Sequence, residues 1–221
     1  MPLLELAGVG RRYGELVALH PVDLAVAAGQ CVALLGPNGS GKSTLLRIAA
    51  GRDQPTDGSV RFDGEPLREE SLHARARIAV VGDATGCYPD LTVREHLLLV
   101  AVGHGVDEPE QWVDWALADR RLTEKASALP SALSSGQFQA LLLASALVRP
   151  RDLLVLDEPE QRLDPQARRD LAARIESETG DGVAVLLATH HTDLALAVAG
   201  HAVLLDEGRV VAEGSPGEVL R

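Results

Sequence analysis

The sequence predicts an α/β sandwich with a mostly parallel core sheet, an N-terminal antiparallel β subdomain and an inserted helical subdomain. Continuous apolar runs at 31–35, 78–82, 153–156 and 183–188 are typical of strands buried on both faces of a parallel sheet. Several of these runs are followed by helical patterns, as in an α/β fold. Residues of about 90–150 contain no convincing strand, so we expect the helical subdomain there.

The composition is that of an acidic globular chain. Its 221 residues suffice for one large domain or two small lobes, and 46% of them are hydrophobic. The formal net charge of −11 argues against a nucleic-acid binder, because phosphate backbones attract lysine and arginine. We therefore expect no nucleic-acid partner.

The sequence favours a protein without a signal peptide or a membrane span. No basic stretch followed by an apolar core occurs at the N-terminus. Residues 126–148 lack charge, but Pro130 and the polar segment 134–137 interrupt them, so we expect no spanning helix. Cys31 and Cys87 lie far apart without metal-ligand or redox spacing. They are expected to be buried free thiols, which suits a reducing cytoplasm.

The beginning of the chain predicts strands of a different kind. Residues 3–27 and 58–63 are expected to form short antiparallel strands around turns such as Asp57-Gly58 and Asp63-Gly64. The buried run at 31–35 then begins the core sheet.

Helix signals follow in the middle of the chain. The stretch Thr92–Glu95 has the spacing of a capping box, so we expect a helix to begin there and to end at Gly103 and Gly105. A following short helix carries Trp112 and Trp115.

A further helix is predicted after the third buried run. Asp164 is its expected N-cap and Pro165 its first-turn proline. Leu171 and Ile175 continue the pattern at helical spacing, and Gly180 is a suitable stop.

A glycine-rich segment after the first buried run predicts a phosphate site. Residues 36–43 read Gly-Pro-Asn-Gly-Ser-Gly-Lys-Ser, which satisfies G-x-x-x-x-G-K-[ST] between a strand and a helix. Glycines let backbone N–H groups converge on phosphate oxygens, and a helix N-terminus adds positive charge. Lys42 is expected to reach the β- and γ-phosphates, and the Ser43 hydroxyl to ligate Mg²⁺. The alternative is an ordinary glycine-rich turn. The predicted fold is therefore a P-loop NTPase sandwich, and the residues expected to bind ATP in this segment are Gly36, Asn38, Gly39, Ser40, Gly41, Lys42, Ser43 and Thr44.

Two other strand ends carry polar side chains toward the same crevice. Asp157 is a candidate Mg²⁺ carboxylate, and Glu158 is placed to orient or deprotonate an attacking water. The alternative for this pair is an N-capping acidic loop. His190 follows the last buried run and is a candidate catalytic residue, since ligands bind at the carboxyl ends of such strands. Its neighbour His191 is expected to point elsewhere.

These residues, in this order, resemble the nucleotide-binding subunit of ABC transporters over essentially the whole chain. The resemblance implies a single domain over 1–221, in which 1–88 and 151–221 form the catalytic core and 89–150 form the helical signature subdomain. Residues 133–137 match four of five positions of the Leu-Ser-Gly-Gly-Gln signature. The residues that this implies for binding the ATP of a partner subunit are Ser134, Ser135, Gly136 and Gln137.

The resemblance also implies an assembly and further site residues. Catalysis is expected in a head-to-tail dimer, a homodimer or a heterodimer, with two ATP sandwiched between its subunits. Tyr13 matches the aromatic residue that stacks on adenine, and Leu163-Asp164 match a loop where dimer contacts form.

Several positions depart from the family pattern, among them residues 138–140, which lack the basic residues common there. Asp83 stands where Gln is usual and can still ligate Mg²⁺. Ser135 replaces the first glycine of the signature pair, and Arg162 stands where a small residue is usual. We expect these changes to affect the rate of hydrolysis rather than nucleotide binding.

The resulting functional hypothesis is an ATP-hydrolysing subunit on the cytoplasmic face of the membrane, with ATP and Mg²⁺ as cofactors and separately encoded transmembrane subunits as partners. Residues 87–101 resemble subunits that serve exporters more than importers. One alternative is a non-transport or hydrolysis-impaired ATPase of the same family in a heterodimer. Another is a P-loop small-molecule kinase, which the lack of an arginine-rich lid disfavours.

Overall fold

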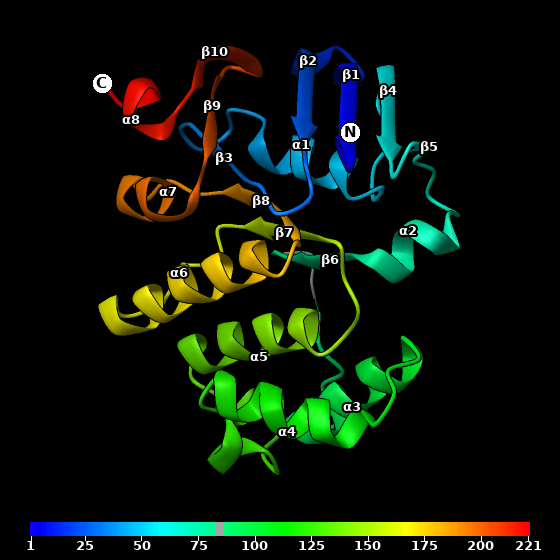
Figure 1. The fold of residues 1–221 in the computed structure, drawn as a ribbon, viewed down its shortest axis with the longest axis vertical. Coiled ribbons are helices and arrows are strands. Elements are labelled where there is room, and N and C mark those ends of the chain that lie inside the picture. The colour runs from blue at the N-terminus through cyan, green and yellow to red at the C-terminus, as the bar shows by residue number, and fades with distance from the viewer. Residues whose placement is uncertain (83–85) are drawn as a thin grey trace.

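A six-stranded core sheet runs through the middle of the molecule (Figure 1). The computed structural model describes residues 1–82 and 86–221. The strands of this sheet span Cys31–Leu35 (β3), Ile78–Val81 (β6), Leu153–Asp157 (β7), Ala184–Ala188 (β8), His201–Asp206 (β9) and Arg209–Gly214 (β10). Their order is β10-β9-β3-β8-β7-β6, and only β10 pairs antiparallel with its neighbour. The four predicted core strands therefore form, each within one residue of its expected bounds.

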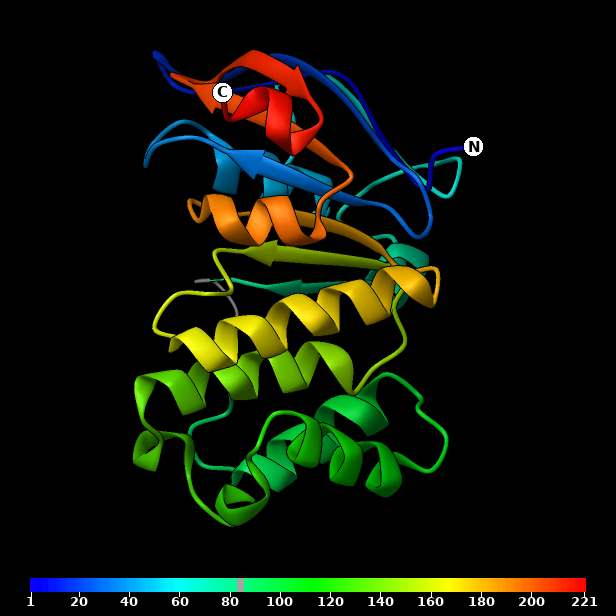
Figure 2. The same cartoon turned by 60° about the vertical axis from the view of Figure 1, so that its left-hand side comes forward.

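Both faces of the core sheet are covered, which explains why its strands are continuously apolar. The covering helices are α1 (Lys42–Ala49) on one face and α5 (Ser135–Leu147), α6 (Pro165–Gly180) and α7 (Thr192–Val198) on the other. Val32 and Leu34 pack with α1, whereas Leu154 and Leu156 pack with α5 and α6. Because successive strand residues point to opposite faces, every residue here must be apolar. Figure 2 shows α6 and α5 lying side by side beneath the sheet.

A second, antiparallel sheet lies on the α1 side. Its strands are β1 (Leu4–Tyr13), β2 (Leu16–Val26), β4 (Asp57–Phe62) and β5 (Glu65–Pro66), in the order β2-β1-β4-β5. The predicted turn at Asp63-Gly64 joins β4 to β5. The predicted turn at Asp57-Gly58 is wrong, because these residues begin β4. Gly58 has a φ of +82°, and a Cβ there would lie 2.4 Å from the Ala7 oxygen, so this glycine allows close pairing with β1.

The helical part has a core of its own. It contains α3 (Val93–Gly103), α4 (Pro109–Asp119) and two short 3₁₀ turns at Thr123–Lys125 and Pro130–Ala132. The predicted capping box at Thr92 forms, and Leu97, Val113 and Leu141 are buried together. α5 also presents Leu142 and Leu143 to the core sheet. This helix therefore belongs to both cores and joins the predicted subdomain 89–150 to the rest of the chain.

The remaining elements were not predicted as such. A short helix α2 (Leu72–Arg77) precedes β6, β9 and β10 form a hairpin, and α8 (Pro216–Val219) ends the chain. Cys31 is buried, which raises the pKa of its thiol to about 12, but Cys87 is only half-buried, contrary to expectation. Across the described ranges, every helix is too short or too polar to cross a membrane.

Candidate functional site

The segment Gly36–Ser43 forms a cradle between β3 and α1. Gly41 is the N-cap of α1 with a φ of +102°, and having no side chain it leaves the first turn of the helix without a side-chain cap. The φ of Gly36 is +140°, and a Cβ there would lie 2.1 Å from the Leu205 oxygen. The buried Ser40 hydroxyl has no hydrogen-bond partner among the described residues. Uncapped amides at a helix N-terminus and an unpartnered hydroxyl are suited to an anion.

Lys42 folds back over this cradle. Its Nζ donates hydrogen bonds to the Gly36 oxygen at 2.8 Å and to the Pro37 oxygen at 2.9 Å. The side chain is 5% exposed, and within the described residues it makes no ion pair. A buried ammonium group without a carboxylate partner favours an anionic ligand, since burying an unpaired charge is costly.

The cradle opens into a cavity of about 600 Å³. Its volume lies within the range of sites that enclose a small organic ligand. The cavity brings together the cradle, the end of β7, the start of β2 and the β9–β10 turn. Its lining residues are Leu16, Val17, Ala18, Asn38, Gly39, Gly41, Lys42, Ser43, Thr44, Asp157, Glu158, Gln161, Glu207 and Gly208.

The two carboxylates at the end of β7 reach the cavity by different routes. Asp157 is the last residue of the strand, whereas Glu158 has a φ of +48° and its N–H donates to the Ala188 oxygen at 2.9 Å. A positive φ is costly for a residue with a side chain, and such strain clusters at functional sites. Gln161 donates to Glu158 Oε2, and His190 Nδ1 lies 3.6 Å from the same oxygen. The structure thus brings the predicted Glu158 and His190 together.

Oxygen ligands for a hard cation also face this cavity. Ser43 lies in the first turn of α1 and Asp157 is the last residue of β7, and both line the same cavity. Oxygen donors are those that Mg²⁺ prefers, so these residues fit the predicted ion. The third predicted metal ligand, Asp83, lies outside the described residues.

Sequence reasoning missed two side chains next to His190. Glu160 is 1% exposed, and the Thr189 hydroxyl donates to its Oε1, while the His191 N–H donates to that hydroxyl at 2.9 Å. The His191 ring lies beside the His190 ring, with centroids 4.5 Å apart, but it lines a separate cavity beside Arg168 and not the cradle cavity. In the sequence, Glu160 is simply an acidic residue two positions after Glu158, and its proximity to the histidines becomes apparent only in the folded chain.

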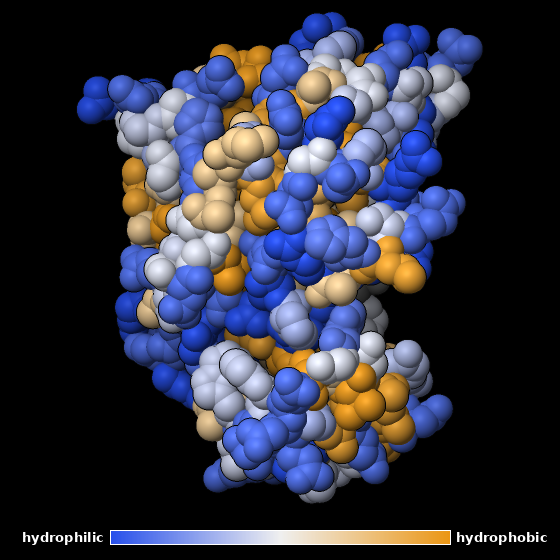
Figure 3. Space-filling model, turned by 45° about the vertical axis from the view of Figure 1, so that its right-hand side comes forward, coloured by the Kyte–Doolittle hydropathy of each residue, from blue (hydrophilic) through white to orange (hydrophobic). Residues whose placement is uncertain are grey.

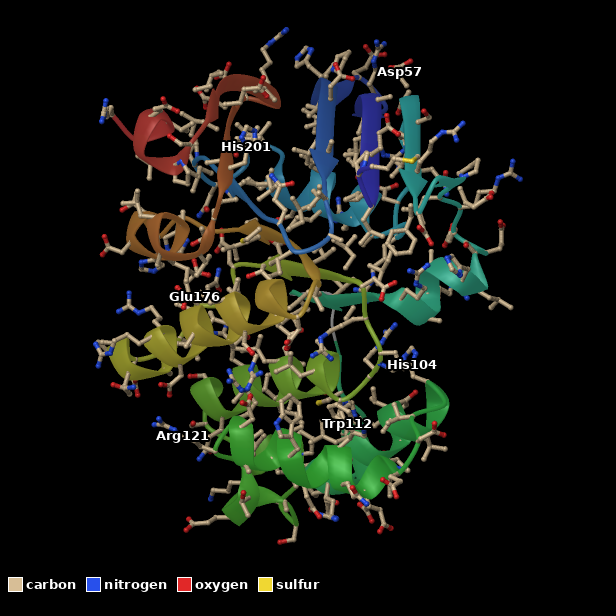
Figure 4. All side chains as sticks on the ribbon, in the orientation of Figure 1. Asp57, His104, Trp112, Arg121, Glu176 and His201 are labelled. Carbon is tan, nitrogen blue, oxygen red and sulfur yellow. The ribbon has the colours of Figure 1, made fainter. Side chains whose placement is uncertain are left out.

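The predicted signature segment lies at the N-terminus of α5. Ser134 is the N-cap and forms a capping box with Gln137, in which each side chain accepts the other residue's backbone N–H. Ser135 and Gly136 begin the helix, and all four residues line a cavity of about 420 Å³ together with Arg162, Leu163 and Asp164. Arg121, which is labelled in Figure 4, also lines it and pairs with Asp170 on α6 at 2.7 Å. This cavity shares no lining residue with the cradle cavity.

Tyr13 is not among the residues that line the cradle cavity. Its hydroxyl donates to Asp53 at 2.5 Å and accepts from Arg47 at 3.0 Å, and the Arg11 guanidinium lies 4.5 Å from its ring centroid. Its strand partner Leu16 does line the cavity. The role of Tyr13 in adenine stacking stays a prediction.

Comparisons with known proteins agree with this geometry. Residues 19–161 match the family model described as ABC transporter. The chain is 38% identical to a Nod factor export ATP-binding protein I of Cupriavidus pinatubonensis, over 99% of this chain and 68% of that protein. It is 39% identical to the protein of the same name from Paraburkholderia xenovorans, over 98% and 72%.

Solved structures give the same result. A structure described as an ATP-binding subunit of an ABC transporter superposes with a TM-score of 0.90 at 32% identity, covering 98% of this chain and 91% of that one. A dimeric ATP-binding cassette in a post-hydrolysis state with ADP and Pi superposes with a TM-score of 0.87 at 26% identity, covering 96% and 98%.

Proposed function

The chain belongs to the ABC transporter family as an ATP-binding subunit and is an ATPase, and we propose that it hydrolyses ATP in the cavity between the cradle and Glu158. The observation that carries this proposal is the convergence of Lys42, Ser43, Asp157 and Glu158 on one space. Lys42 and Ser43 lie in the first turn of α1, whereas Asp157 ends β7 and Glu158 follows it, so two separate segments supply these side chains.

The cradle holds the triphosphate in this proposal. The amides at the start of α1 and the Lys42 ammonium replace the hydrogen bonds that phosphate oxygens lose on leaving water. Binding would transfer Lys42 Nζ from the Gly36 and Pro37 oxygens to the phosphates. Ser43 and Asp157 would hold Mg²⁺, which supplies positive charge against the phosphate oxygens when bound.

Glu158 is the proposed general base. Its side chain is 17% exposed, and Gln161 donates a hydrogen bond to one of its oxygens, which leaves the other to orient a water and accept its proton. His190 is the proposed contact to the γ-phosphate, because it lies at the end of the neighbouring strand β8 and within reach of Glu158.

The substitution Glu158→Gln tests this assignment. General-base catalysis contributes about 10²- to 10⁴-fold, so ATP turnover should fall by that factor while ATP binding is retained. The matched control is Glu176→Gln, an exposed carboxylate on α6 (Figure 4), which should leave turnover unchanged. Turnover of Glu158→Gln equal to that of the unmodified chain would rule out Glu158 as the base.

The proposed active form is a head-to-tail dimer that encloses two ATP. This rests on the separation of the cradle cavity and the signature cavity within one chain. A helix N-terminus with small residues can approach the γ-phosphate held by a second copy. Light scattering of Glu158→Gln should then show dimers only with Mg-ATP. If ATP binds and the chain remains monomeric, this part of the proposal fails.

The helical lobe is the proposed docking surface for transmembrane subunits at the cytoplasmic face of the membrane. Figure 3 shows hydrophobic residues gathered over this lobe. Large apolar side chains exposed on residues 89–150 include Leu99, Val102, Leu129 and Trp112, the last labelled in Figure 4, and the exposed Tyr88 directly precedes this range. Exposed apolar patches mark interaction sites. We further propose export as the direction, because the relatives named above serve export. Transport into inside-out vesicles by the complex with its membrane subunits tests this; uptake in the opposite sense contradicts it.

The Ser135 side chain supports a second candidate function, that of a hydrolysis-impaired partner in a heterodimer. Ser135 adds a hydroxymethyl group at the first position of α5, and Arg162 has a φ of +64° beside the signature cavity. If this is correct, the purified chain alone should hydrolyse ATP slowly, and a second ATP-binding subunit should accelerate it.

A further inference from the structure

We propose that Glu160, His190 and His191 form a binding site for a transition-metal cation of the Zn²⁺ type. Each of the three offers one ligand atom, and these atoms all lie within 4.8 Å of one another. Two imidazoles and one carboxylate are a donor set that Zn²⁺ accepts, with water in the fourth position. Mg²⁺ prefers oxygen ligands alone, so the proposed site differs in chemistry from the predicted site at Ser43 and Asp157.

Glu160 provides the anchor of the proposed site. The side chain is 1% exposed, and its Oε1 accepts a hydrogen bond from Thr189. Its Oε2 is buried and has no hydrogen-bond partner among the described residues. A buried carboxylate oxygen without a partner is costly, and buried polar atoms in native structures are nearly always paired. A bound cation would remove this cost.

The two histidines provide the mobile part. Their ring centroids are 4.5 Å apart at an interplanar angle of 37°, and the His190 side chain is 49% exposed. Bonds of about 2.0–2.2 Å to a tetrahedral Zn²⁺ place its ligand atoms about 3.4 Å apart. The ligand atoms now lie within 4.8 Å of one another, so binding of Zn²⁺ would require the exposed His190 ring and its neighbour to rotate by a small amount.

Two nearby charges act in opposite directions on a cation. Glu158 Oε2 lies 3.6 Å from His190 Nδ1 and favours positive charge. Arg168 Nη1 lies 3.4 Å from His191 Nδ1, and its guanidinium both repels a cation and competes for that nitrogen. Removing the Arg168 charge should therefore tighten the binding of the metal ion.

Occupation of this site would have a functional consequence that rests on the proposed function. A cation bound to His190 would hold that ring away from the γ-phosphate. Zn²⁺ should therefore inhibit ATP hydrolysis even when Mg²⁺ is in excess. Binding of the cation itself does not depend on the proposed function, because the three ligands are present without nucleotide.

The direct test is a titration of the full chain with Co²⁺, whose visible absorption distinguishes tetrahedral from hydrated octahedral coordination. A Cys87→Ser background removes the half-buried thiol as a competing ligand. One tetrahedral Co²⁺ per chain, displaced by Zn²⁺, is expected. His191→Ala and Glu160→Gln should each weaken the affinity more than tenfold, and Arg168→Gln should strengthen it. His201→Ala, which changes a histidine on β9 (Figure 4), is the matched control and should bind as the parent does.

The outcomes separate this proposal from the assignment of the ATPase site. An octahedral spectrum, or tetrahedral binding that survives His191→Ala in a variant with a native circular dichroism spectrum, overturns the metal site. His191→Ala should keep its metal-free ATPase activity and lose inhibition by Zn²⁺. If the parent chain binds Co²⁺ as expected but Zn²⁺ leaves its turnover unchanged, the link to His190 is wrong. If Glu158→Gln keeps its ATP turnover, the assignment of Glu158 as the base is wrong, and the proposed metal site is unaffected.

Discussion

The N-termini of α1 and α5 are both built from small residues, but only α5 satisfies its own first turn. Ser134 and Gln137 exchange hydrogen bonds in a capping box, so the signature tip is complete within one chain. The N-cap of α1 is Gly41, which has no side chain to offer, and the neighbouring Ser40 hydroxyl has no hydrogen-bond partner in the described part of the chain. The cradle therefore needs a ligand to complete its hydrogen bonds, whereas the signature tip does not.

This difference explains how the N-termini of α1 and α5 can take part in one reaction from different subunits. A cradle that lacks internal partners binds an anion because the anion supplies them. The N-terminus of α5, which is already capped by its own side chains, remains folded without nucleotide and can contact the nucleotide of a second copy without rearranging. Substitutions that act on one end and not on the other therefore test the comparison.

The largest expected effect is at Gly36 in the cradle. In Gly36→Ala the Cβ would meet the Leu205 oxygen at 2.1 Å, and the φ of +140° would also be strained. Overpacking and the left-handed conformation together should cost about 3 kcal/mol of unfolding free energy, which lowers Tm by about 6–12 °C. Gly39→Ala is the control, since a Cβ there has nothing within 4 Å and only its φ of +81° is strained. It should lose about 1 kcal/mol. Equal losses in thermal unfolding without nucleotide would contradict the close approach to Leu205.

The next effect concerns the charge that the cradle contributes. Lys42→Ala removes charged hydrogen bonds to phosphate worth about 1.5–3 kcal/mol, so ATP affinity should fall by about 10- to 100-fold. Lys125→Ala is the matched control, because Lys125 is the chain's other lysine and lies in the helical lobe. Calorimetric titration with ATP measures both variants. An affinity of Lys42→Ala within a factor of two of the parent would mean that the backbone amides hold the phosphates alone.

Local patterns predicted the parts of the molecule that depend on neighbouring residues in sequence. The buried strands, the capping box at Thr92 and the proline-started α6 all appear where the residues indicate. Each depends on contacts within a few residues or on burial of both faces, and these leave a mark in the sequence.

Features that depend on distant segments were missed or wrong. Asp57-Gly58 has good turn chemistry, but pairing with β1 makes it a strand. The β9–β10 turn reaches the cradle because the Gly208 N–H donates to the Ser40 oxygen at 3.0 Å, across more than half of the chain. Glu160 and His191 became visible as one cluster only when β7 and β8 were paired. Tertiary proximity of this kind has no local signal.

A smaller effect is expected from removing the cap of α5. Ser134→Ala deletes the acceptor for the Gln137 N–H and should cost about 1 kcal/mol of unfolding free energy, or about 2–4 °C in Tm. ATP affinity of the monomer should stay unchanged, because the cradle is untouched. Ser134→Thr retains a capping hydroxyl and should retain the stability. A loss of monomer ATP affinity in Ser134→Ala would mean that the two ends are not independent within one chain.

The smallest expected effect is at Ser135, the first residue of α5. Ser135 is exposed at the first position of α5 and takes no part in the capping box, so Ser135→Gly should leave Tm nearly unchanged. Glycine allows closer approach of the backbone to a phosphate. In the Glu158→Gln background, Mg-ATP-dependent dimerisation should tighten about threefold, or about 0.7 kcal/mol. Ser135→Ala separates the side chain's bulk from its hydroxyl and should dimerise as the parent does. If Ser135→Gly instead weakens the dimer and Ser135→Ala weakens it equally, the hydroxyl itself binds the partner's nucleotide. The N-terminus of α5 would then contact the partner's nucleotide through a side-chain hydroxyl, whereas the cradle at α1 uses backbone N–H groups. The two helix N-termini would differ in the groups that bind phosphate, and not in whether their own hydrogen bonds are satisfied.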